Sequence, residues 1–123
     1  MTNKSFEIII KKSRFISYVF PIKDKNEIKP IIAELAKENK KARHVCYAYR
    51  LIIDGVENAG FNDDGEPKHT AGKPIYDILR IKELDNVLVV VIRYFGGIML
   101  GAGGLTRAYR ESAKIAIEDY IKQ

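Results

Sequence analysis

Hydrophobic residues recur along this chain with two different periods, and the changes of period divide it into strands and helices. β-Branched and aromatic residues crowd Phe6–Ile10 and Phe15–Phe20, which we expect to form two strands, or one strand interrupted near Ser13. Pro21 ends this region. A helix should follow, because isoleucine and leucine then recur at i, i+3, i+4 and i+7 from Ile28.

The start of that first helix has two alternatives. Asp24 and Glu27 have the spacing of a capping box, which would begin the helix at once. Pro30 is better accommodated if the helix begins nearer Asn26, because proline costs least in the first turn. In either case the helix should end near Asn39.

A hairpin and a buried strand dominate the rest of the chain. Strands over His44–Ile53 and Val56–Phe61 flank Asp54-Gly55, the strongest short hairpin signal in the sequence. Val87–Ile92 is apolar at every position, which is typical of a central strand covered on both faces.

Two more helices complete the order of elements. Pro74 suits the first turn of one helix, and apolar positions from Leu105 to Tyr120 predict the last. The order β(β)αββαβα predicts an α+β fold, a mostly antiparallel sheet of four or slightly more strands with helices packed on it. With no internal repeat or linker, we expect residues 1–123 to form one domain.

Glycine is concentrated in the loop Arg93–Gly104. Five of the nine glycines fall within Gly96–Gly104, between the apolar strand and the last helix. Such density indicates backbone with positive φ or a close approach to another group. A glycine loop that opens a helix also presents N–H groups to a ligand, whereas tight turning and close helix packing would explain the same residues without one.

Nucleotide-binding motifs are absent from this loop. Gly96 and Gly101 have the Walker spacing, but no Lys follows, and Thr106 stands where the dinucleotide fingerprint has its third glycine. What remains is an anion or carboxylate held by helix N–H groups with Arg93 and Arg107 nearby.

The loop Asn62–Lys73 carries three crowded carboxylates, those of Asp63, Asp64 and Glu66. They are compatible with a magnesium site or a general acid/base pair. They are equally compatible with a turn, because Asp-Asp-Gly is ordinary turn chemistry.

The charge of the chain permits a polyanionic partner without requiring one. The chain has 21 Lys and Arg against 16 Asp and Glu, a net charge of +5 with a pI near 9.3. A candidate polyanion patch lies at one junction and comprises Lys37, Lys40, Lys41 and Arg43. The alternative is a solvated helix end, where cations are also favourable.

The single cysteine, Cys46, excludes an internal disulfide, and we expect it to be a buried, inert thiol. The N-terminus lacks the apolar region of a secretory signal, and no run is long enough to cross a bilayer. We therefore expect a cytoplasmic protein without membrane association.

Several motifs, in order, resemble the signature of the IMPACT/YigZ family. In the C-terminal half they are Asp63-Asp64-Gly65-Glu66-Pro67, Thr70-Ala71-Gly72-Lys73-Pro74, Arg93-Tyr94-Phe95-Gly96-Gly97, Leu100-Gly101-Ala102-Gly103-Gly104-Leu105 and Arg107-Ala108-Tyr109. In the N-terminal half they are Ser13-Arg14-Phe15-Ile16, and His44 with Cys46-Tyr47-Ala48-Tyr49-Arg50. The resemblance covers nearly the whole chain.

The resemblance implies a fold like the second domain of ribosomal small-subunit protein five. Eukaryotic members are similar to regulators of translation that compete for a ribosome-associated activator of a stress kinase, and nucleic-acid or ribosome-related binding is associated with bacterial members. It therefore implies a non-enzymatic binding or regulatory module, with no catalytic residue, cofactor or metal. Its expected partner is a protein, the ribosome or RNA, with direct nucleic-acid contact and self-association among the alternatives.

The resemblance also implies a binding surface in a groove between loops 62–73 and 93–104. The residues that carry over to it are Asp63, Asp64, Glu66, Arg93, Tyr94, Gly96, Gly97, Gly101, Gly103, Gly104 and Arg107. An alternative function is a metal-assisted hydrolase or phosphoryl-handling enzyme that uses the three carboxylates, and a third is that both loops only build the fold.

The chain departs from the bacterial pattern in two respects. Lys68 and His69 stand where small residues are usual, and we expect their bulk to narrow or recharge the groove. Bacterial relatives usually continue into a ferredoxin-like domain, whereas this sequence stops at Gln123, so we expect that domain to be missing.

Overall fold

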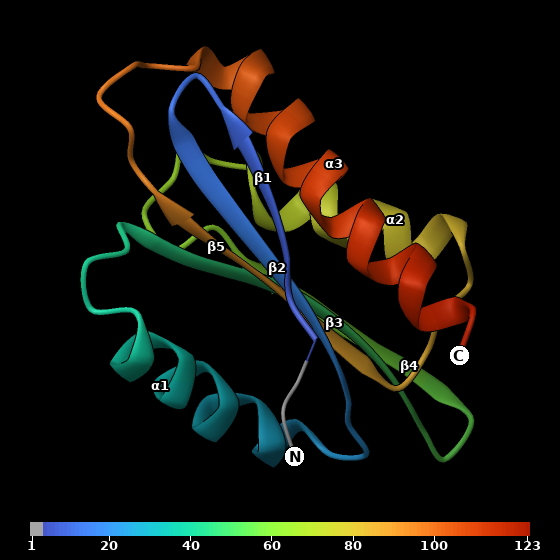
Figure 1. Ribbon diagram of the computed structural model, residues 1–123. Helices are drawn as coiled ribbons and strands as arrows, with labels where there is room; N and C mark the ends of the chain where they lie inside the picture. Colours follow the sequence, from blue (N-terminus) through green and yellow to red (C-terminus); the bar gives the residue numbers. More distant parts are fainter. Residues whose placement is uncertain (1–3) are drawn as a thin grey trace.

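Helices cover both faces of a five-stranded antiparallel sheet in the computed structural model, which describes residues 4–123 (Figure 1). The strands are β1 (Phe6–Ile10), β2 (Ser13–Pro21), β3 (His44–Ile53), β4 (Val56–Asn62) and β5 (Val87–Tyr94). The helices are α1 (Ile28–Glu38), α2 (Gly72–Ile81) and α3 (Gly101–Ile121), with a short 3₁₀ turn at Lys25–Glu27. The predicted α+β fold is confirmed, and the sheet order is β1-β2-β5-β3-β4.

Strand β5 lies in the middle of the sheet and contributes to two separate cores. Alternate side chains point to opposite faces of a strand, so its apolar run divides between them. Val87, Val89 and Val91 pack with α2 and α3, whereas Leu88, Val90 and Ile92 pack on the α1 side. The predicted central strand covered on both faces is therefore confirmed.

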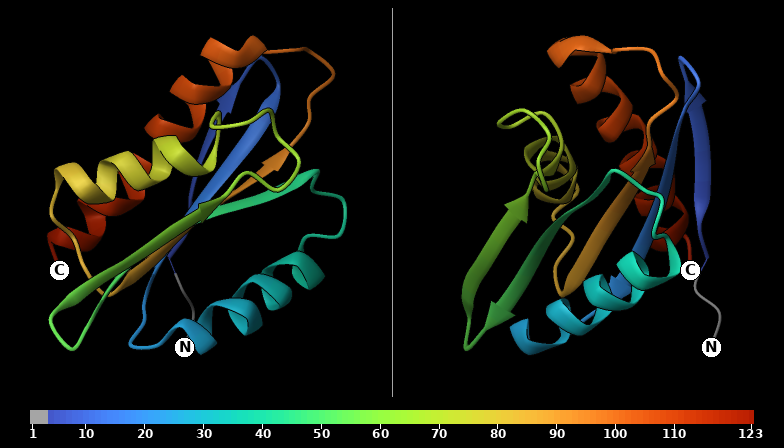
Figure 2. Two further views of the ribbon diagram at one scale, coloured as in Figure 1. Left: turned by 180° about the vertical axis from the view of Figure 1, so that it is seen from behind. Right: turned by 90° about the vertical axis from the view of Figure 1, so that its left-hand side faces the viewer.

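The helical layers lie on opposite sides of this sheet. Figure 2 shows α1 alone on one face and α2 with α3 together on the other. Phe15, Ile75 and Ile117 belong to the core beneath α2 and α3, and Ile28 and Leu35 anchor α1 on the opposite face. Of the helices in the described part of the chain, none combines the length and apolar character that a membrane span requires.

The beginning of α1 satisfies both predicted alternatives. Asp24 and Glu27 form the capping box, with Asn26 N donating to Asp24 Oδ1 at 2.7 Å and Asp24 N donating to Glu27 Oε2 at 2.9 Å. This box caps the 3₁₀ turn, after which α1 begins at Ile28. Pro30 then falls in the first turn of α1, where its missing N–H needs no partner.

Two boundaries differ from the sequence expectations. The break between the first strands is a turn at Lys11 and Lys12, with φ of 47° and 69°, rather than at Ser13. A Lys-Lys pair lacks the Asn-Gly chemistry that marks such turns, so the sequence gives no signal there. Helix α3 begins at Gly101, earlier than the predicted Leu105, because its first turn is glycine-rich and largely exposed and so carries no apolar periodicity in the sequence.

Gly96 holds loop 93–104, which we call the glycine loop, against the β1–β2 turn. A Cβ atom at this position would lie 2.1 Å from the carbonyl carbon and oxygen of Lys12. Gly96 N also donates to Ser13 Oγ at 3.2 Å. Only a residue without a side chain allows this approach, so the loop and the turn are fixed together.

We predict that Gly96→Ala lowers the free energy of unfolding by about 3 kcal/mol, the upper end for overpacking, because the contact is with backbone that cannot move aside. Gly103→Ala is the matched control, since its Cβ would meet only Arg107 Nη1 at an ordinary 3.6 Å. The control should leave stability unchanged or raise it by up to about 1 kcal/mol. Urea unfolding of both variants measures the difference, and equal stabilities would contradict the close approach.

Candidate functional site

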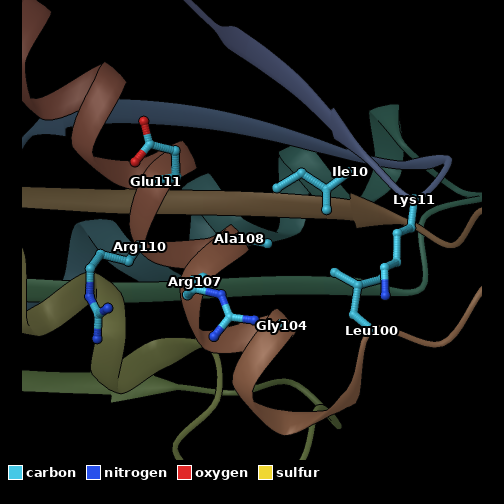
Figure 3. A pocket seen from close by; sticks show the side chains of 8 residues that line it. All are labelled: Ile10, Lys11, Leu100, Gly104, Arg107, Ala108, Arg110 and Glu111. Atoms are coloured by element: carbon cyan, nitrogen blue, oxygen red, sulfur yellow. The ribbon is translucent and has the colours of Figure 1, made fainter.

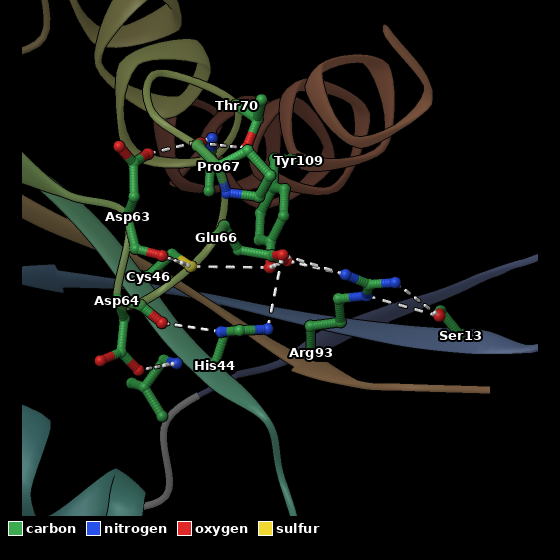
Figure 4. Close-up of polar contacts among 12 residues, drawn as sticks. Ser13, His44, Cys46, Asp63, Asp64, Glu66, Pro67, Thr70, Arg93 and Tyr109 are labelled. Atoms are coloured by element: carbon green, nitrogen blue, oxygen red, sulfur yellow. Dashed lines mark hydrogen bonds and ion pairs between the residues drawn. The ribbon is translucent and has the colours of Figure 1, made fainter. Parts of the chain in front are cut away.

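A buried ion pair between Glu66 and Arg93 lies where the two predicted loops meet (Figure 4). The residues are 8% and 5% exposed, and Arg93 Nη1 donates to both carboxylate oxygens of Glu66, at 3.1 and 2.9 Å. Tyr109 OH donates to Glu66 Oε2 at 2.5 Å. Arg93 Nε and Nη2 donate to Ser13 Oγ at 3.4 and 3.3 Å. This network joins loop 62–73 to β5, α3 and β2.

The partners of this pair make burial of the two charges tolerable. Removal of two charges from water costs several kcal/mol each, which is recovered only when the polar atoms find good partners. The guanidinium of Arg93 also lies 5.7 Å from the Phe15 ring centroid and 5.5 Å from that of Phe95. Aromatic faces on the cation add attraction in a site from which water is excluded.

His44 adds a third group to the Glu66 carboxylate. His44 Nδ1 lies 2.7 Å from the carbonyl oxygen of Asp64, which can only accept, so Nδ1 carries a proton and donates. His44 Nε2 then faces Glu66 Oε1 at 3.4 Å. The ring of His44, the first residue of β3, thereby contacts two residues of loop 62–73, which we call the acidic loop.

The carboxylates of Asp63 and Asp64 accept hydrogen bonds from backbone N–H groups. Asp63 accepts N–H groups from His69 at 2.9 Å, Ala71 at 3.2 Å and Gly72 at 2.8 Å, and so fixes the start of α2. Asp64 Oδ2 accepts Val45 N at 2.7 Å.

The three carboxylates therefore face different partners. Within residues 4–123, no three His, Cys, Asp or Glu side chains converge as ligands for one metal ion. The arrangement of loop 62–73 favours the turn interpretation for Asp63 and Asp64, whereas Glu66 forms a buried ion pair, which none of the expectations included.

Cys46 and Tyr109 extend the network into the core. Cys46 Sγ lies 3.2 Å from the Asp63 carbonyl oxygen and 3.5 Å from Tyr109 OH, and the thiol is fully buried. Burial raises the pKa of the Cys46 thiol far above its ordinary 9.0. Burial first, and then the neighbouring Cys46 and Glu66, raise the pKa of Tyr109 far above its ordinary 10.0. Both groups stay protonated, which agrees with the predicted inert thiol.

A cavity of about 290 Å³ opens above the ion pair, between the two loops. Its walls come from the start of β3 and the residue before it, from loop 62–73, from loop 93–104 and from the first turns of α3. They are Arg43, His44, Glu66, Pro67, Arg93, Phe95, Met99, Leu100, Gly101, Ala102 and Leu105. We call this cavity the loop groove. It lies between the two loops to which the family resemblance assigns a binding groove.

The rim of the loop groove is apolar and cationic. Met99 is 80% exposed, and the Arg43 guanidinium lies 5.1 Å from the Phe95 ring centroid. Helix α3 begins beside it without a side-chain hydrogen bond from its N-cap residue, Leu100. The floor of the groove consists of charged groups that pair with each other inside the protein, whereas the side chains of the rim are exposed and available for contact with another molecule.

The structure brings some of the predicted site residues into this groove and places others elsewhere. Glu66, Arg93 and Gly101 line it. Tyr94 points to the opposite face of the sheet, where its OH donates to Asn39 Oδ1 at 2.5 Å. Of the candidate polyanion patch, Arg43 lines the groove, whereas exposed Lys37, Lys40 and Lys41 lie on α1 and the turn that follows it.

The remaining predicted residues have other positions. Arg107 and Gly104 line a second cavity, which shares Leu100 with the loop groove. Gly97, with φ of 87°, turns the loop, and Gly103 lies in the first turn of α3.

Lys68 and His69 were expected to narrow or recharge the groove, but neither is among the described residues that line it. Both are exposed, and the His69 ring lies edge-on to Phe61 of β4 at 5.7 Å.

Sequence reasoning missed the structural partners of the ion pair. Ser13 and Tyr109 are far from Glu66 in the chain, and each occurs in a segment that reads as ordinary strand or helix. One signal existed for Tyr109, because a tyrosine on the buried face of a helix needs a partner for its hydroxyl. Met99 offered no signal beyond its place in a glycine-rich loop.

The comparisons with known proteins agree with this architecture. The family model of the Impact N-terminal domain matches residues 11–117. The chain belongs to the Impact N-terminal domain family. Its relatives include the IMPACT family member YvyE of Bacillus subtilis, 45% identical over 107 residues that make up 86% of this chain and 48% of YvyE. IMPACT family member YigZ of Escherichia coli is 38% identical over 115 residues, 93% of this chain and 56% of YigZ.

Solved structures extend the family comparison to the fold. The crystal structure of a hypothetical protein superposes with a TM-score of 0.87 at 36% identity, covering 94% of this chain and 57% of the other. The structure of the two-domain translational regulator Yih1 superposes with a TM-score of 0.58 at 23% identity, covering 93% and 46%, and shows a shared fold. The chain thus spans about half the length of the family members YvyE and YigZ.

We predict that Arg93→Ala lowers the free energy of unfolding by about 3–5 kcal/mol, because it leaves the Glu66 carboxylate buried without its cation. Arg14→Ala is the matched control, since Arg14 pairs with Glu7 at 2.7 Å on the surface, where ion pairs contribute little. Urea unfolding measures both variants, and an equally small loss in each would show that the buried pair is not required.

We predict that the Cys46 thiol makes stability fall with rising pH. The pKa of this thiol is raised in the folded protein. Its contribution to the free energy of unfolding is therefore complete below about pH 9 and is lost as the pH rises further, because the unfolded chain then releases the proton and the folded chain retains it. The slope of unfolding free energy between about pH 8 and about pH 10 should be flatter in Cys46→Ala than in the parent protein. Identical slopes would mean that the thiol titrates equally in both states.

Proposed function

We propose that this chain is a non-enzymatic binding module that acts in translation and holds a protein partner in the loop groove. The observation that carries the proposal is the contrast within the groove. Its floor is a buried ion pair with every charge partnered inside the protein, and its rim is exposed, apolar and cationic.

The rim has the composition of a protein-recognition surface. Aromatic residues, Met and Arg are enriched at the cores of protein interfaces, and the rim combines Phe95, Met99 and Arg43. Ile98, 40% exposed, extends the apolar area beside Met99. Phe95, Ile98 and Met99 come from a loop that is fixed by Gly96 and Arg93. A partner would therefore meet a preformed apolar surface there and lose less free energy to ordering.

The floor supports binding rather than catalysis. A catalytic acid, base or nucleophile must be free to exchange a proton or to reach a substrate. Glu66 is held by Arg93 and Tyr109, and the raised pKa of the Cys46 thiol keeps it from acting as a nucleophile.

Membership of the Impact N-terminal domain family supports a role in translation. The fold is shared with Yih1, described as a two-domain translational regulator. A partner in the translation machinery, at or near ribosomes, fits that relationship and would place the protein in the cytoplasm. The net charge of +5 would add a salt-sensitive attraction to ribosomal RNA that is independent of the groove.

We predict that the protein sediments with ribosomes from its own host and that Met99→Glu abolishes this association at raised salt, because a carboxylate would be placed in the apolar rim. Ile81→Glu is the matched control, since Ile81 is 64% exposed at the end of α2, away from the groove. The control should sediment like the parent protein.

Two results would contradict the proposal. Equal sedimentation of Met99→Glu and Ile81→Glu at raised salt would place the contact outside the groove. Association that disappears on raising the salt, in all variants alike, would assign it to the net charge and to nucleic acid.

A further inference from the structure

A second cavity, of about 390 Å³ (Figure 3), shares Leu100 with the loop groove. It is formed by the end of β1, the β1–β2 turn and the first half of α3. Ile10, Leu100 and Ala108 give it an apolar lining, and Lys11, Arg107 and Arg110 give it three cations. We infer that this cavity binds an acidic peptide segment that carries an aliphatic side chain.

The cations are available to a ligand. Within residues 4–123, Lys11, Arg107 and Arg110 donate no side-chain hydrogen bond and form no ion pair. In Figure 3, Arg107 lies between Arg110 at one end and Lys11 at the other. Like charges that line one cavity repel one another, and carboxylates of a ligand would relieve that repulsion.

The β1–β2 turn places Lys11 in this cavity, in a strained backbone conformation. The pairing of Ile10 with Ser13 leaves a two-residue turn, in which Lys11 and Lys12 have φ of 47° and 69°. Glycine and asparagine are the usual residues of such turns, so lysine is strained in this conformation. The close contact between Gly96 and Lys12 keeps the strained turn in place. A strained conformation that is enforced by its surroundings is typical of functional positions.

The remaining lining favours a peptide over a nucleic acid. The aliphatic side chains of Ile10 and Leu100 suit an aliphatic residue of a ligand. Among the described residues that line the cavity, none is aromatic and could stack on a base. Glu111 repels phosphates and carboxylates alike, but it accepts a hydrogen bond from a peptide N–H, a donor that a phosphate group lacks. An acidic peptide with one apolar side chain satisfies all of these groups.

This site is separate from the proposed function of the loop groove. Leu100 lines both cavities, whereas the charged residues of each differ. Variants of Arg107 or Arg110 therefore test the second cavity without changing Met99 or Arg43, and the two proposals can fail independently.

The test uses fluorescence anisotropy with three labelled probes: a glutamate-rich peptide with one central leucine, the same peptide with serine for leucine, and oligouridylate. The parent protein should bind the leucine peptide, and Arg107→Glu and Arg110→Glu should each weaken binding roughly tenfold, because each reverses a charge facing the ligand. Arg80→Glu is the matched control, with the same change of charge at the far end of α2, and should bind like the parent.

The serine peptide should bind several-fold more weakly than the leucine peptide. Thermal unfolding confirms that the exposed substitutions leave the protein folded. The inference is overturned if the parent does not bind the leucine peptide, if Arg107→Glu and Arg110→Glu bind like Arg80→Glu, or if leucine and serine peptides bind equally. Tighter, Arg107-dependent binding of oligouridylate would also overturn it and assign the cavity to nucleic acid.

Discussion

The ion pair between Glu66 and Arg93 is the interaction on which the architecture of the site depends. It is buried where the acidic loop, β5, α3 and β2 meet, and Ser13 and Tyr109 complete its hydrogen bonds. A charge in such a place is tolerated only while its partner is present, so the pair makes the positions of the two loops depend on each other. The loop groove is therefore a fixed feature of the folded chain rather than a space between independent loops.

Much of the fold could be predicted because the spacing of apolar residues along the chain matches the positions that are buried in its strands and helices. The apolar run of β5, the spacing of α1 and the Asp54-Gly55 turn each carry a local signal. The β1–β2 turn could not be placed, because Lys11 and Lys12 adopt a conformation that only contacts from distant residues such as Gly96 enforce. Long-range packing decides such positions.

The candidate site was predictable as two loops but not as a set of side-chain contacts. Glu66 and Asp63 are the same kind of group three residues apart, yet one meets a guanidinium and the other caps α2. Arg93 and Tyr94 are adjacent, and the alternation of the strand sends them to opposite faces. Loop 93–104 also contributes to two chemically different cavities, both of which Leu100 lines.

The most direct test of the central role of the ion pair is amide hydrogen exchange, followed by mass spectrometry, in the parent protein and in Glu66→Gln. Removal of the negative charge should increase exchange in residues 62–73 and 93–104 together, while the β3–β4 turn at Asp54-Gly55 exchanges as before. Faster exchange in residues 62–73 alone, with residues 93–104 unchanged, would show that the glycine loop is held independently of the pair and would contradict the account.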